Sequence, residues 1–412
     1  MIPEVRAKIE HIQLRSISEG YKKSKVGVIP DAWCCYQIHE CLSICNYERK
    51  PISEDVRKTI PGPYPYYGPT QAQGYIATYE SEGPAVLIGE DGDHFLKYKN
   101  QEMTMYVDGK YTVNNHAHVL RGTELCETKW FYYAYQHKSL FDAITRQGAG
   151  RYKLTKEALI KLSLQCPPIE EQKKIISILN TQDKVIKLKE KRLAEKQRQK
   201  KYLMQQLLTG KKRLPGFSEE WKKVKIGSFI KEIDERSTVN NQYEILSVTK
   251  NGMVFQSSHF NKQIASENNV GYKVVRRGNL AFSTMNLWMG SLDTLRICDT
   301  GIVSPAYKVF EFNQSLIVVN FAENYMKSAE MIWLYKANSE QGASIVRRNL
   351  DLQALLNSEV ALPDISEQTA IAEVLSAADH EIDLLRQDIE QEKQKKKALM
   401  QLLLTGIVRV KI

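Results

Sequence analysis

Long apolar runs are missing from this sequence of 412 residues. No stretch approaches the roughly 18 uninterrupted apolar residues that a membrane span needs, and the polar N-terminal segment lacks the apolar core of a secretory signal. We therefore expect a cytoplasmic protein with no membrane partner.

Cysteine is sparse, and the seven present are an odd number, which favours free thiols in a reducing compartment over a disulfide framework. Four of them, Cys34, Cys35, Cys41 and Cys45, crowd around His39. Their spacing lacks the paired C-x2-C motifs of a zinc finger. We interpret them as small apolar side chains of a core strand and helix, with a zinc site as the alternative.

Catalytic motifs are also missing. The chain has no glycine-rich cofactor loop, no P-loop and no Asp/Asn-Pro-Pro-aromatic segment of a methyltransferase. Asp108, Glu127 and Lys129 loosely imitate an acidic Mg²⁺ site, but a salt-bridged surface explains them as well. His116 and His118 share one side of an expected strand, where loop or core positions compete with a metal or catalytic role. We expect a non-catalytic chain with no metal or cofactor of its own.

Size and charge set the positive expectations. A chain of 412 residues exceeds what one hydrophobic core supports, so we expect at least two domains. Hydrophobic residues at 42% and charged residues at 26% are typical of a folded globular protein. The net charge of +10 favours a polyanionic partner.

A long internal repeat dominates the sequence. Residues 167–214 match residues 363–410 without a gap, so that Glu171-Gln172 and Glu367-Gln368 lie 196 positions apart. Each copy begins after a proline and ends in Leu-Leu-Thr-Gly, which is normal helix punctuation. Apolar residues recur every seven positions and predict a coiled-coil seam: Leu179, Ile186, Leu193 and Leu207, then Leu375, Ile382, Ile389 and Leu403.

The two repeated helices are expected to pair with each other, because each carries one apolar stripe that must be buried. We favour antiparallel pairing, which would place two globular domains at opposite ends of a rod. Parallel pairing would bring the domains together. Lys200 and Lys396 occupy an apolar seam position in both copies, where they either fix the register or extend their stems to solvent.

The segments before the helices read as short strands joined by turns. Both open with a proline turn and a tryptophan, Trp33 or Trp221, and both close with Gln-Gly-Ala, at residues 147–149 and 341–343. Between these marks they diverge. The predicted fold is α+β: a pseudo-two-fold tandem repeat of two mixed α/β domains separated by a long antiparallel two-helix coiled coil. The boundaries are 1–20 for an N-terminal segment, 21–166 and 215–362 for the domains, and 167–214 and 363–412 for the helical regions.

These features resemble the specificity subunit of a type I restriction-modification enzyme. The resemblance rests on the divergent domains, their tryptophan openings and the helices that run from Pro-x-Ile-x-Glu-Gln to Leu-Leu-Thr-Gly, and it covers residues 27 to 412. It implies that each domain is a target recognition domain reading one half of a bipartite asymmetric DNA site. The paired helices would set the spacer and dock methyltransferase subunits.

Further partners follow from the same resemblance. Double-stranded DNA and restriction/translocase subunits would join the complex, and S-adenosylmethionine, ATP and Mg²⁺ would belong to the partner subunits. The first helix carries a basic run from Lys184 to Lys201 that either contacts phosphates or is a solvated face.

Side chains that read DNA must present basic, amide or aromatic groups on turns. In the first domain we predict Tyr66, Tyr67, Gln71, Asn114, Asn115, Arg146 and Arg151. In the second we predict Lys250, Arg276, Arg277, Thr284, Asn286, Trp288, Arg347 and Arg348. For the tyrosines and Trp288 a core position is the alternative.

Two other classes of function remain open at this point. One is an endonuclease or methyltransferase with a divergent site, which would show Mg²⁺- or S-adenosylmethionine-dependent activity in the purified chain. The other is a coiled-coil scaffold that does not bind DNA, whose binding would lack sequence preference and a steep salt dependence.

Overall fold

The computed structural model describes residues 19–147, 151–249, 252–259, 268–341 and 348–411. The chain divides into two compact units. Unit 1 comprises Met1–Leu188 with Ile389–Ile412, and unit 2 comprises Lys189–Asp388. Each unit therefore holds one globular domain and one end of each repeated helix.

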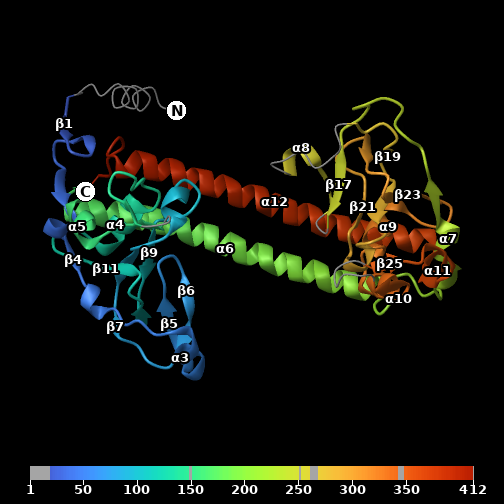
Figure 1. Ribbon diagram of the computed structural model, residues 1–412, viewed down its shortest axis with the longest axis horizontal. Helices are drawn as coiled ribbons and strands as arrows, with labels where there is room; N and C mark the ends of the chain where they lie inside the picture. Colours follow the sequence, from blue (N-terminus) through green and yellow to red (C-terminus); the bar gives the residue numbers. More distant parts are fainter. Residues whose placement is uncertain (1–18, 148–150, 250–251, 260–267, 342–347, 412) are drawn as a thin grey trace. The chain divides into compact units, whose positions relative to one another are not determined.

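The repeated segments form two unbroken helices, α6 (Ile169–Leu207) and α12 (Ile365–Leu404), drawn in green and red in Figure 1. The two predicted long helices are confirmed, and they end at Leu207 and Leu404, before the limits of the helical regions at residues 214 and 412. Gly210 and Gly406 lie just beyond the helix ends with φ of 65° and 73°. This left-handed conformation disfavours residues with a Cβ, which explains why both copies stop at glycine.

In unit 1 the two helices pair antiparallel. Glu171 at the start of α6 binds Arg409, beyond the end of α12, at 2.6 Å. Further along α6, Asp183 binds Lys396 at 2.7 Å. Because Lys396 precedes Arg409 in the chain whereas Asp183 follows Glu171, the two helices run in opposite directions.

Unit 2 has the same antiparallel arrangement in its own half of the helices. Lys189 and Lys196 of α6 bind Asp388 and Glu381 of α12 at 2.7 and 2.9 Å. Antiparallel pairing is thus confirmed within each unit, and the parallel alternative is wrong. Seam residues Leu179, Ile186, Leu207, Leu375, Ile382, Ile389 and Leu403 are buried, and Leu193 is half-buried.

The domain of unit 1 contains two four-stranded sheets. One has the order β4-β11-β8-β9, with strands Leu42–Ile44, Ala117–Gly122, Ala85–Gly89 and Thr104–Val107. The other has the order β6-β5-β10-β7, with strands Ala72–Ile76, Pro61–Tyr67, Lys110–Val113 and Ser81–Glu82. Two-stranded pairs are β1-β2 (Tyr21–Ser24, Gly27–Pro30), β3-β14 (Cys34–Gln37, Ser163–Cys166) and β12-β13 (Thr145–Gln147, Arg151–Lys153). The helices are α2 (Ile38–Cys41), α3 (Glu54–Thr59), α4 (Thr128–Tyr135) and α5 (Lys156–Lys161).

The domain of unit 2 is built around one four-stranded sheet of order β16-β23-β20-β21, with strands Ile230–Ile233, Tyr307–Phe312, Leu280–Ser283 and Leu292–Thr294. Two-stranded pairs are β15-β26 (Lys222–Lys225, Glu359–Leu362), β17-β18 (Leu246–Thr249, Gly252–Phe255), β19-β22 (Lys273–Arg276, Thr300–Val303) and β24-β25 (Ser339–Gln341, Arg348–Leu350). Its helices are α7 (Ile226–Phe229), α8 (Gln256–His259), α9 (Val319–Tyr325), α10 (Ala329–Ala337) and α11 (Leu352–Asn357).

The two domains share one frame. The four-stranded sheets match strand by strand: β4-β11-β8-β9 in unit 1 corresponds to β16-β23-β20-β21 in unit 2. Outside these sheets, the elements of unit 1 match those of unit 2 in chain order: β3 and α2 match β15 and α7, α4 matches α9, the β12-β13 hairpin matches the β24-β25 hairpin, and α5 and β14 match α11 and β26. The sequences that diverge between the opening tryptophan and the closing Gln-Gly-Ala therefore fold alike. The second sheet of unit 1 also has a counterpart: the antiparallel pairs β5-β6 and β7-β10 match β17-β18 and β19-β22, and the parallel pairing of β5 with β10 matches the parallel bridge between Ile245 and Ile302.

Buried apolar contacts join each domain to its helix ends. In unit 1, Trp33 and Trp130 meet edge to face with ring centroids 5.8 Å apart, in a core that also contains Leu179 of α6 and Leu403 of α12. In unit 2, Phe229 and Tyr325 belong to the same core as Leu207 and Leu375.

The domains are mixed α/β as predicted, but the sequence pattern located only strands in them and missed the helices α4, α9 and α10. Helices of seven to nine residues span about two turns, too few for the seven-residue pattern to stand out. Within the described ranges, no helix is long and apolar enough to cross a membrane.

Candidate nucleic-acid interface

One surface element recurs at the same point of the shared frame: the turn after the central buried strand, held by the two-stranded hairpin that follows later in the chain. In unit 1 this turn is Glu90-Asp91-Gly92, after β8. The Gly92 N–H donates to the Tyr152 carbonyl at 3.0 Å, and the Leu154 N–H donates to the Glu90 carbonyl at 2.7 Å.

In unit 2 the corresponding turn is Thr284-Met285-Asn286, after β20. The Arg348 N–H, on the β24-β25 hairpin, donates to the Met285 carbonyl at 3.3 Å. The Arg348 guanidinium lies over the Trp288 ring, 4.9 Å from its centroid. Four predicted residues, Thr284, Asn286, Trp288 and Arg348, therefore meet on one surface, and all four are half-buried.

Two polar groups in this cluster have no hydrogen-bond partner among the described residues. They are the buried Nε1 of Trp288 and the buried Nε of Arg348. A buried donor without an acceptor costs about 1–3 kcal/mol. An acceptor supplied by a bound partner after a small side-chain movement would remove that cost.

Unit 1 has an amide-lined hollow near its own predicted residues. Asn114, Asn115, Gln73 and Arg57 line a cavity of about 300 Å³. The Asn114 Nδ2 donates to Gln73 Oε1 at 3.2 Å, and its Oδ1 accepts from the His116 N–H at 2.8 Å. Asn114 is therefore fixed and mostly buried, whereas Asn115 and Gln73 are exposed.

A second polar hollow of about 460 Å³ lies beside the turn of unit 1 and contains residues that the sequence analysis missed. Its lining includes Tyr47, which is 83% exposed, together with Arg49, Lys153 and Lys156. They come from segments far apart in the sequence, so no local spacing could have indicated them.

The charges in this second hollow are partly neutralised by Glu90. Its carboxylate accepts from Arg49 at 2.7 Å and pairs with Lys153 at 3.3 Å. Burial raises the pKa of Glu90, but the hydrogen bonds from Arg49 and Lys153 outweigh burial and lower the pKa overall. Glu90 is therefore ionised and holds both cations in place.

His118 is a core histidine. It is 1% exposed, its Nδ1 lies 2.9 Å from Asn46 Nδ2, and its Nε2 lies 2.8 Å from the Leu154 carbonyl. Burial lowers its pKa, so that the ring is neutral at pH 7. His116 is exposed and pairs with Asp91 at 2.9 Å, so the two histidines do not converge on one metal.

The two predicted tyrosines of unit 1 are less accessible than the amides. Tyr66 lines the amide-lined hollow but is only 1% exposed, and its hydroxyl accepts from the Ile52 N–H and donates to the Lys50 carbonyl. Tyr67 packs against Tyr111 and is half-buried, as expected for the core alternative.

The other predicted residues of unit 1 lie on its surface. Gln71 is exposed in the turn between β5 and β6, and Arg146 and Arg151 are exposed on the β12-β13 hairpin.

Arg276 and Arg277 of unit 2 are exposed but already paired. Arg276 binds Glu235 at 2.6 Å, and Arg277 binds Asp299 at 2.7 Å. Each would have to exchange a carboxylate for a phosphate in order to contact DNA. Lys250 and Arg347 lie outside the described residues.

The basic run of α6 divides into two groups. Lys189, Lys196 and Lys200 are half-buried and pair with carboxylates of α12. The exposed cations are Lys184, Lys187, Lys191, Arg192, Arg198 and Lys201, of which Arg192 reaches Glu381 at 3.5 Å. Only the exposed group remains suited to contact phosphates.

The suspected acidic metal site is not assembled. Within the described part of the chain, the one cluster of three or more potential metal ligands consists of cysteines, and neither Asp108 nor Glu127 belongs to it. Asp108 accepts from the Gly109 N–H, and Lys129 donates to Asn180.

The Glu-Gln pair at the start of each helix is a buried anchor. In α6, Glu171 accepts from Trp33 Nε1 at 3.1 Å and from both Nε and an Nη of Arg409 at 2.6 and 2.7 Å. Gln172 accepts from the Glu127 N–H at 2.9 Å and donates to the Leu125 and Pro167 carbonyls.

The same anchor recurs at the start of α12. Glu367 accepts from Trp221 at 3.2 Å and from Arg213 in a two-pronged contact at 2.6 Å. Gln368 accepts from the Val318 N–H at 2.8 Å. The repeated sequence motif thus ties each helix start to its domain, and is not part of the candidate DNA surface.

Comparisons with known proteins agree on one family. The family described as "Type I restriction modification DNA specificity domain" matches twice, over residues 30–197 and 218–394. The type I restriction enzyme MjaVIII specificity subunit of Methanocaldococcus jannaschii is 23% identical over 424 residues, covering 95% of this chain and 97% of the relative. A type I specificity subunit of Haemophilus influenzae is 33% identical over 143 residues, about 35% of each chain.

A solved structure has the same fold. The S subunit of the type I restriction-modification system from M. genitalium superimposes with a TM-score of 0.56 at 12% identity, over 94% of this chain and 99% of its own. The two matches to this family together span most of the sequence. The chain belongs to the type I restriction-modification DNA specificity family, as a DNA-recognition subunit that is not itself catalytic.

Proposed function

We propose that the two domains of this chain read the two halves of a bipartite, asymmetric DNA sequence. The observation that carries this proposal is a shared frame with different side chains at the same point. The turn after the central strand is Glu90-Asp91-Gly92 in unit 1 and Thr284-Met285-Asn286 in unit 2.

Different side chains on matched turns imply different preferred bases. Base edges are distinguished by donors and acceptors, with Asn and Gln suited to adenine and Arg to guanine. Unit 1 offers Gln71, Gln73, Asn115, Arg146 and Arg151 on exposed segments. Unit 2 offers Thr284, Asn286 and Arg348 around Trp288. Two such unlike sets favour an asymmetric target.

The partner assignments extend this proposal. The paired helices α6 and α12 set the spacer between the half-sites, and their exposed faces dock the methyltransferase subunits. Restriction/translocase subunits complete the assembly. S-adenosylmethionine, ATP and Mg²⁺ act in those partners.

The test is selection of bound fragments from random double-stranded DNA, with the methyltransferase partner present, followed by binding measurements over a range of salt. We expect two conserved blocks separated by a fixed gap. We also expect affinity to fall by about a thousand-fold between roughly 50 and 200 mM salt if six or more phosphates are contacted. Fragments without a common sequence and a shallow salt dependence would favour the scaffold alternative.

A further inference from the structure

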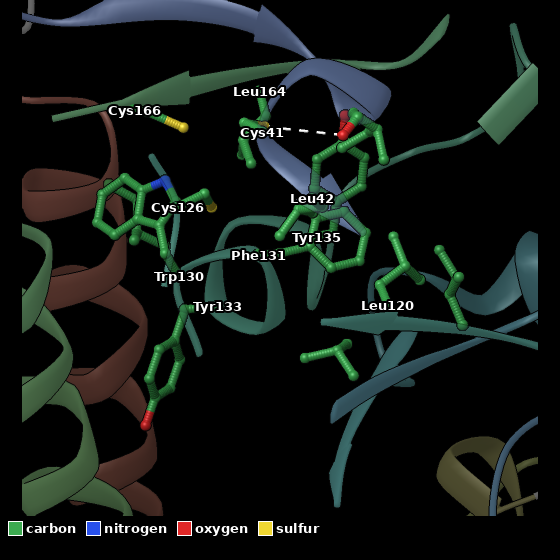
Figure 2. Close-up of a cluster of buried hydrophobic side chains, with 14 of the residues drawn as sticks. Cys41, Leu42, Leu120, Cys126, Trp130, Phe131, Tyr133, Tyr135, Leu164 and Cys166 are labelled. Carbon is green, nitrogen blue, oxygen red and sulfur yellow. Dashed lines mark hydrogen bonds between the residues drawn. The ribbon is translucent and has the colours of Figure 1, made fainter. Parts of the chain in front are cut away.

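Three buried cysteines converge in the core of unit 1. Cys41 ends α2, Cys126 precedes α4, and Cys166 ends β14. Their sulfur atoms all lie within 4.8 Å of one another, and none of the three residues is more than 2% exposed. Figure 2 shows them together beside Trp130.

The three equivalent positions in unit 2 carry no cysteine. Phe229 ends α7 as Cys41 ends α2, and Leu362 ends β26 as Cys166 ends β14. Ile317 is equivalent to Cys126. Each directly precedes a residue whose N–H donates to the glutamine at the helix start: Val318 to Gln368 in unit 2, and Glu127 to Gln172 in unit 1. All three unit 2 residues are buried. The shared frame therefore packs with hydrocarbon alone, and the thiols are a property of unit 1.

Residues around the three thiols are apolar or already hydrogen-bonded. Trp33, Phe131 and Leu164 belong to the same buried cluster, and Trp130 Nε1 donates to the Gln165 carbonyl at 2.8 Å. Tyr135 donates to the Ser163 carbonyl at 2.8 Å. In the part of the chain that the structure describes, no fourth His, Cys, Asp or Glu joins the group.

Two of the three thiols make long contacts with backbone carbonyls. The Cys41 Sγ lies 3.6 and 3.9 Å from the Gln37 and Ile38 carbonyls, and the Cys126 Sγ lies 3.5 Å from the Glu127 carbonyl. A thiolate is the form of cysteine that binds metals.

We propose that Cys41, Cys126 and Cys166 bind one thiophilic metal ion, of the Cu(I) class, in a three-coordinate site. Thiolate sulfur selects soft ions such as Cu(I). Bonds of about 2.3 Å at roughly 120° would separate the sulfur atoms by about 4 Å, which fits within their present spread. A structural zinc ion prefers four ligands, and this group supplies three.

A bound ion would link three parts of unit 1. It would connect α2, the start of α4 and the end of β14, from which the chain passes through Pro167-Pro168 into α6. Each thiol that becomes a ligand releases its proton to solvent, so affinity should rise with pH.

The first experiment titrates the reduced full-length chain with Cu(I), without oxygen, against a competing Cu(I) chelator. We expect one tightly held ion per chain and new sulfur-to-metal absorption in the ultraviolet. Cys126→Ser should weaken binding by at least a hundred-fold. Cys34→Ser and Cys298→Ser, which change cysteines outside the group, should leave it unchanged. Equal binding by Cys126→Ser would overturn the proposal.

A second measurement does not depend on the folding of a variant. X-ray absorption of the Cu(I)-loaded wild-type chain should give three sulfur neighbours at about 2.3 Å. Hydrogen exchange should slow in peptides around Cys41, Cys126 and Cys166 and not around Phe229, Ile317 and Leu362. No stoichiometric Cu(I) binding, a shell containing nitrogen or oxygen, or four-ligand binding of Zn(II) in preference to Cu(I) would each refute the three-coordinate assignment.

Discussion

At the scale of single residues, the buried glutamates at the helix starts explain why a charged motif is repeated so closely. Glu171 is fully buried yet receives three hydrogen bonds, two of them from Arg409. A buried charge is tolerated when it is paired and hydrogen-bonded, and becomes costly when one partner is removed.

Arg409→Ala should therefore destabilise the chain more than the loss of an ordinary surface ion pair. The substitution leaves the Glu171 carboxylate buried with only Trp33 as hydrogen-bond donor. We expect the free energy of unfolding to fall by about 2–3 kcal/mol, less than for a fully buried ion pair, because Arg409 is itself partly exposed. Denaturant unfolding measures the effect. The matched control is Arg386→Ala, whose exposed pair with Asp383 should contribute less than about 0.5 kcal/mol. Equal effects of the two variants would contradict the anchor role.

His118 makes the stability of unit 1 depend on pH. Burial lowers the pKa of His118 in the folded chain below its ordinary value of about 6.5, so folding favours the neutral ring. This contribution is complete above the unfolded pKa and is lost as pH falls below about 6.5. Melting temperature measured from pH 7.5 to 5 should fall more steeply for wild type than for His118→Gln. Parallel curves would contradict this prediction.

At the scale of elements, the helix pair carries the same ion pair at two equivalent places. Lys200 binds Asp379 at 2.5 Å in unit 2, and Lys396 binds Asp183 at 2.7 Å in unit 1. Both lysines and both aspartates are 196 positions apart. The seam lysines therefore pair across the helices, which favours the interpretation that they fix the register over the one that they only extend to solvent.

Reversing one of these pairs tests that interpretation. Lys200→Asp places a carboxylate against Asp379 and should lower stability by about 1 kcal/mol, because like charges replace an attractive contact. The double variant Lys200→Asp/Asp379→Lys restores an ion pair of opposite charges with the two signs exchanged. In a double-mutant cycle it should recover most of the lost stability. Thermal unfolding measures both. Additive losses would show that the two residues do not interact.

A longer helix pair tests the proposed spacer role. Four residues inserted after Lys196 in α6 and at the facing Glu381 of α12 lengthen the pair by about 6 Å, close to two base-pair steps. DNA selection should then yield a gap longer by roughly one or two base pairs. The same four residues inserted in the β1-β2 turn at Lys25 should not change the gap. An unaltered gap in the helix variant would reject the spacer role.

At the scale of the whole molecule, the repeated parts were predictable from the sequence and the recognition surfaces only in part. A constant offset and a seven-residue period specify α6, α12 and their seam, because both signals are local. The common sheet order was not predictable, since strands such as Ala85–Gly89 and Leu280–Ser283 share position but little sequence. Their equivalence is visible only in the pairing of strands distant in the chain.

Residue type alone also leaves open how exposed a side chain is, because tertiary contacts decide it. Tyr66 was predicted as a DNA contact from its turn-rich surroundings, but its hydroxyl binds backbone groups near Lys50 in the core. Tyr47, Arg49 and Lys153 went unnoticed, because they are brought together by folding over more than a hundred residues. The cysteines near His39 were predicted as core side chains, and Cys41 and Cys45 are buried, but Cys34 is exposed. The zinc alternative is not assembled there: Cys41 joins Cys126 and Cys166, and His39 lies 3.1 Å from the Ile160 carbonyl.

The central claim is that each unit reads its own half-site. The most direct measurement is DNA selection with two double variants, Asn115→Ala/Arg151→Ala in unit 1 and Asn286→Ala/Arg348→Ala in unit 2, each with the methyltransferase partner present. We expect each variant to lose base preference in one half-site, a different half for each, at a cost of about 1–3 kcal/mol per lost base contact. Both variants relaxing the same half, or neither changing either half, would contradict the account.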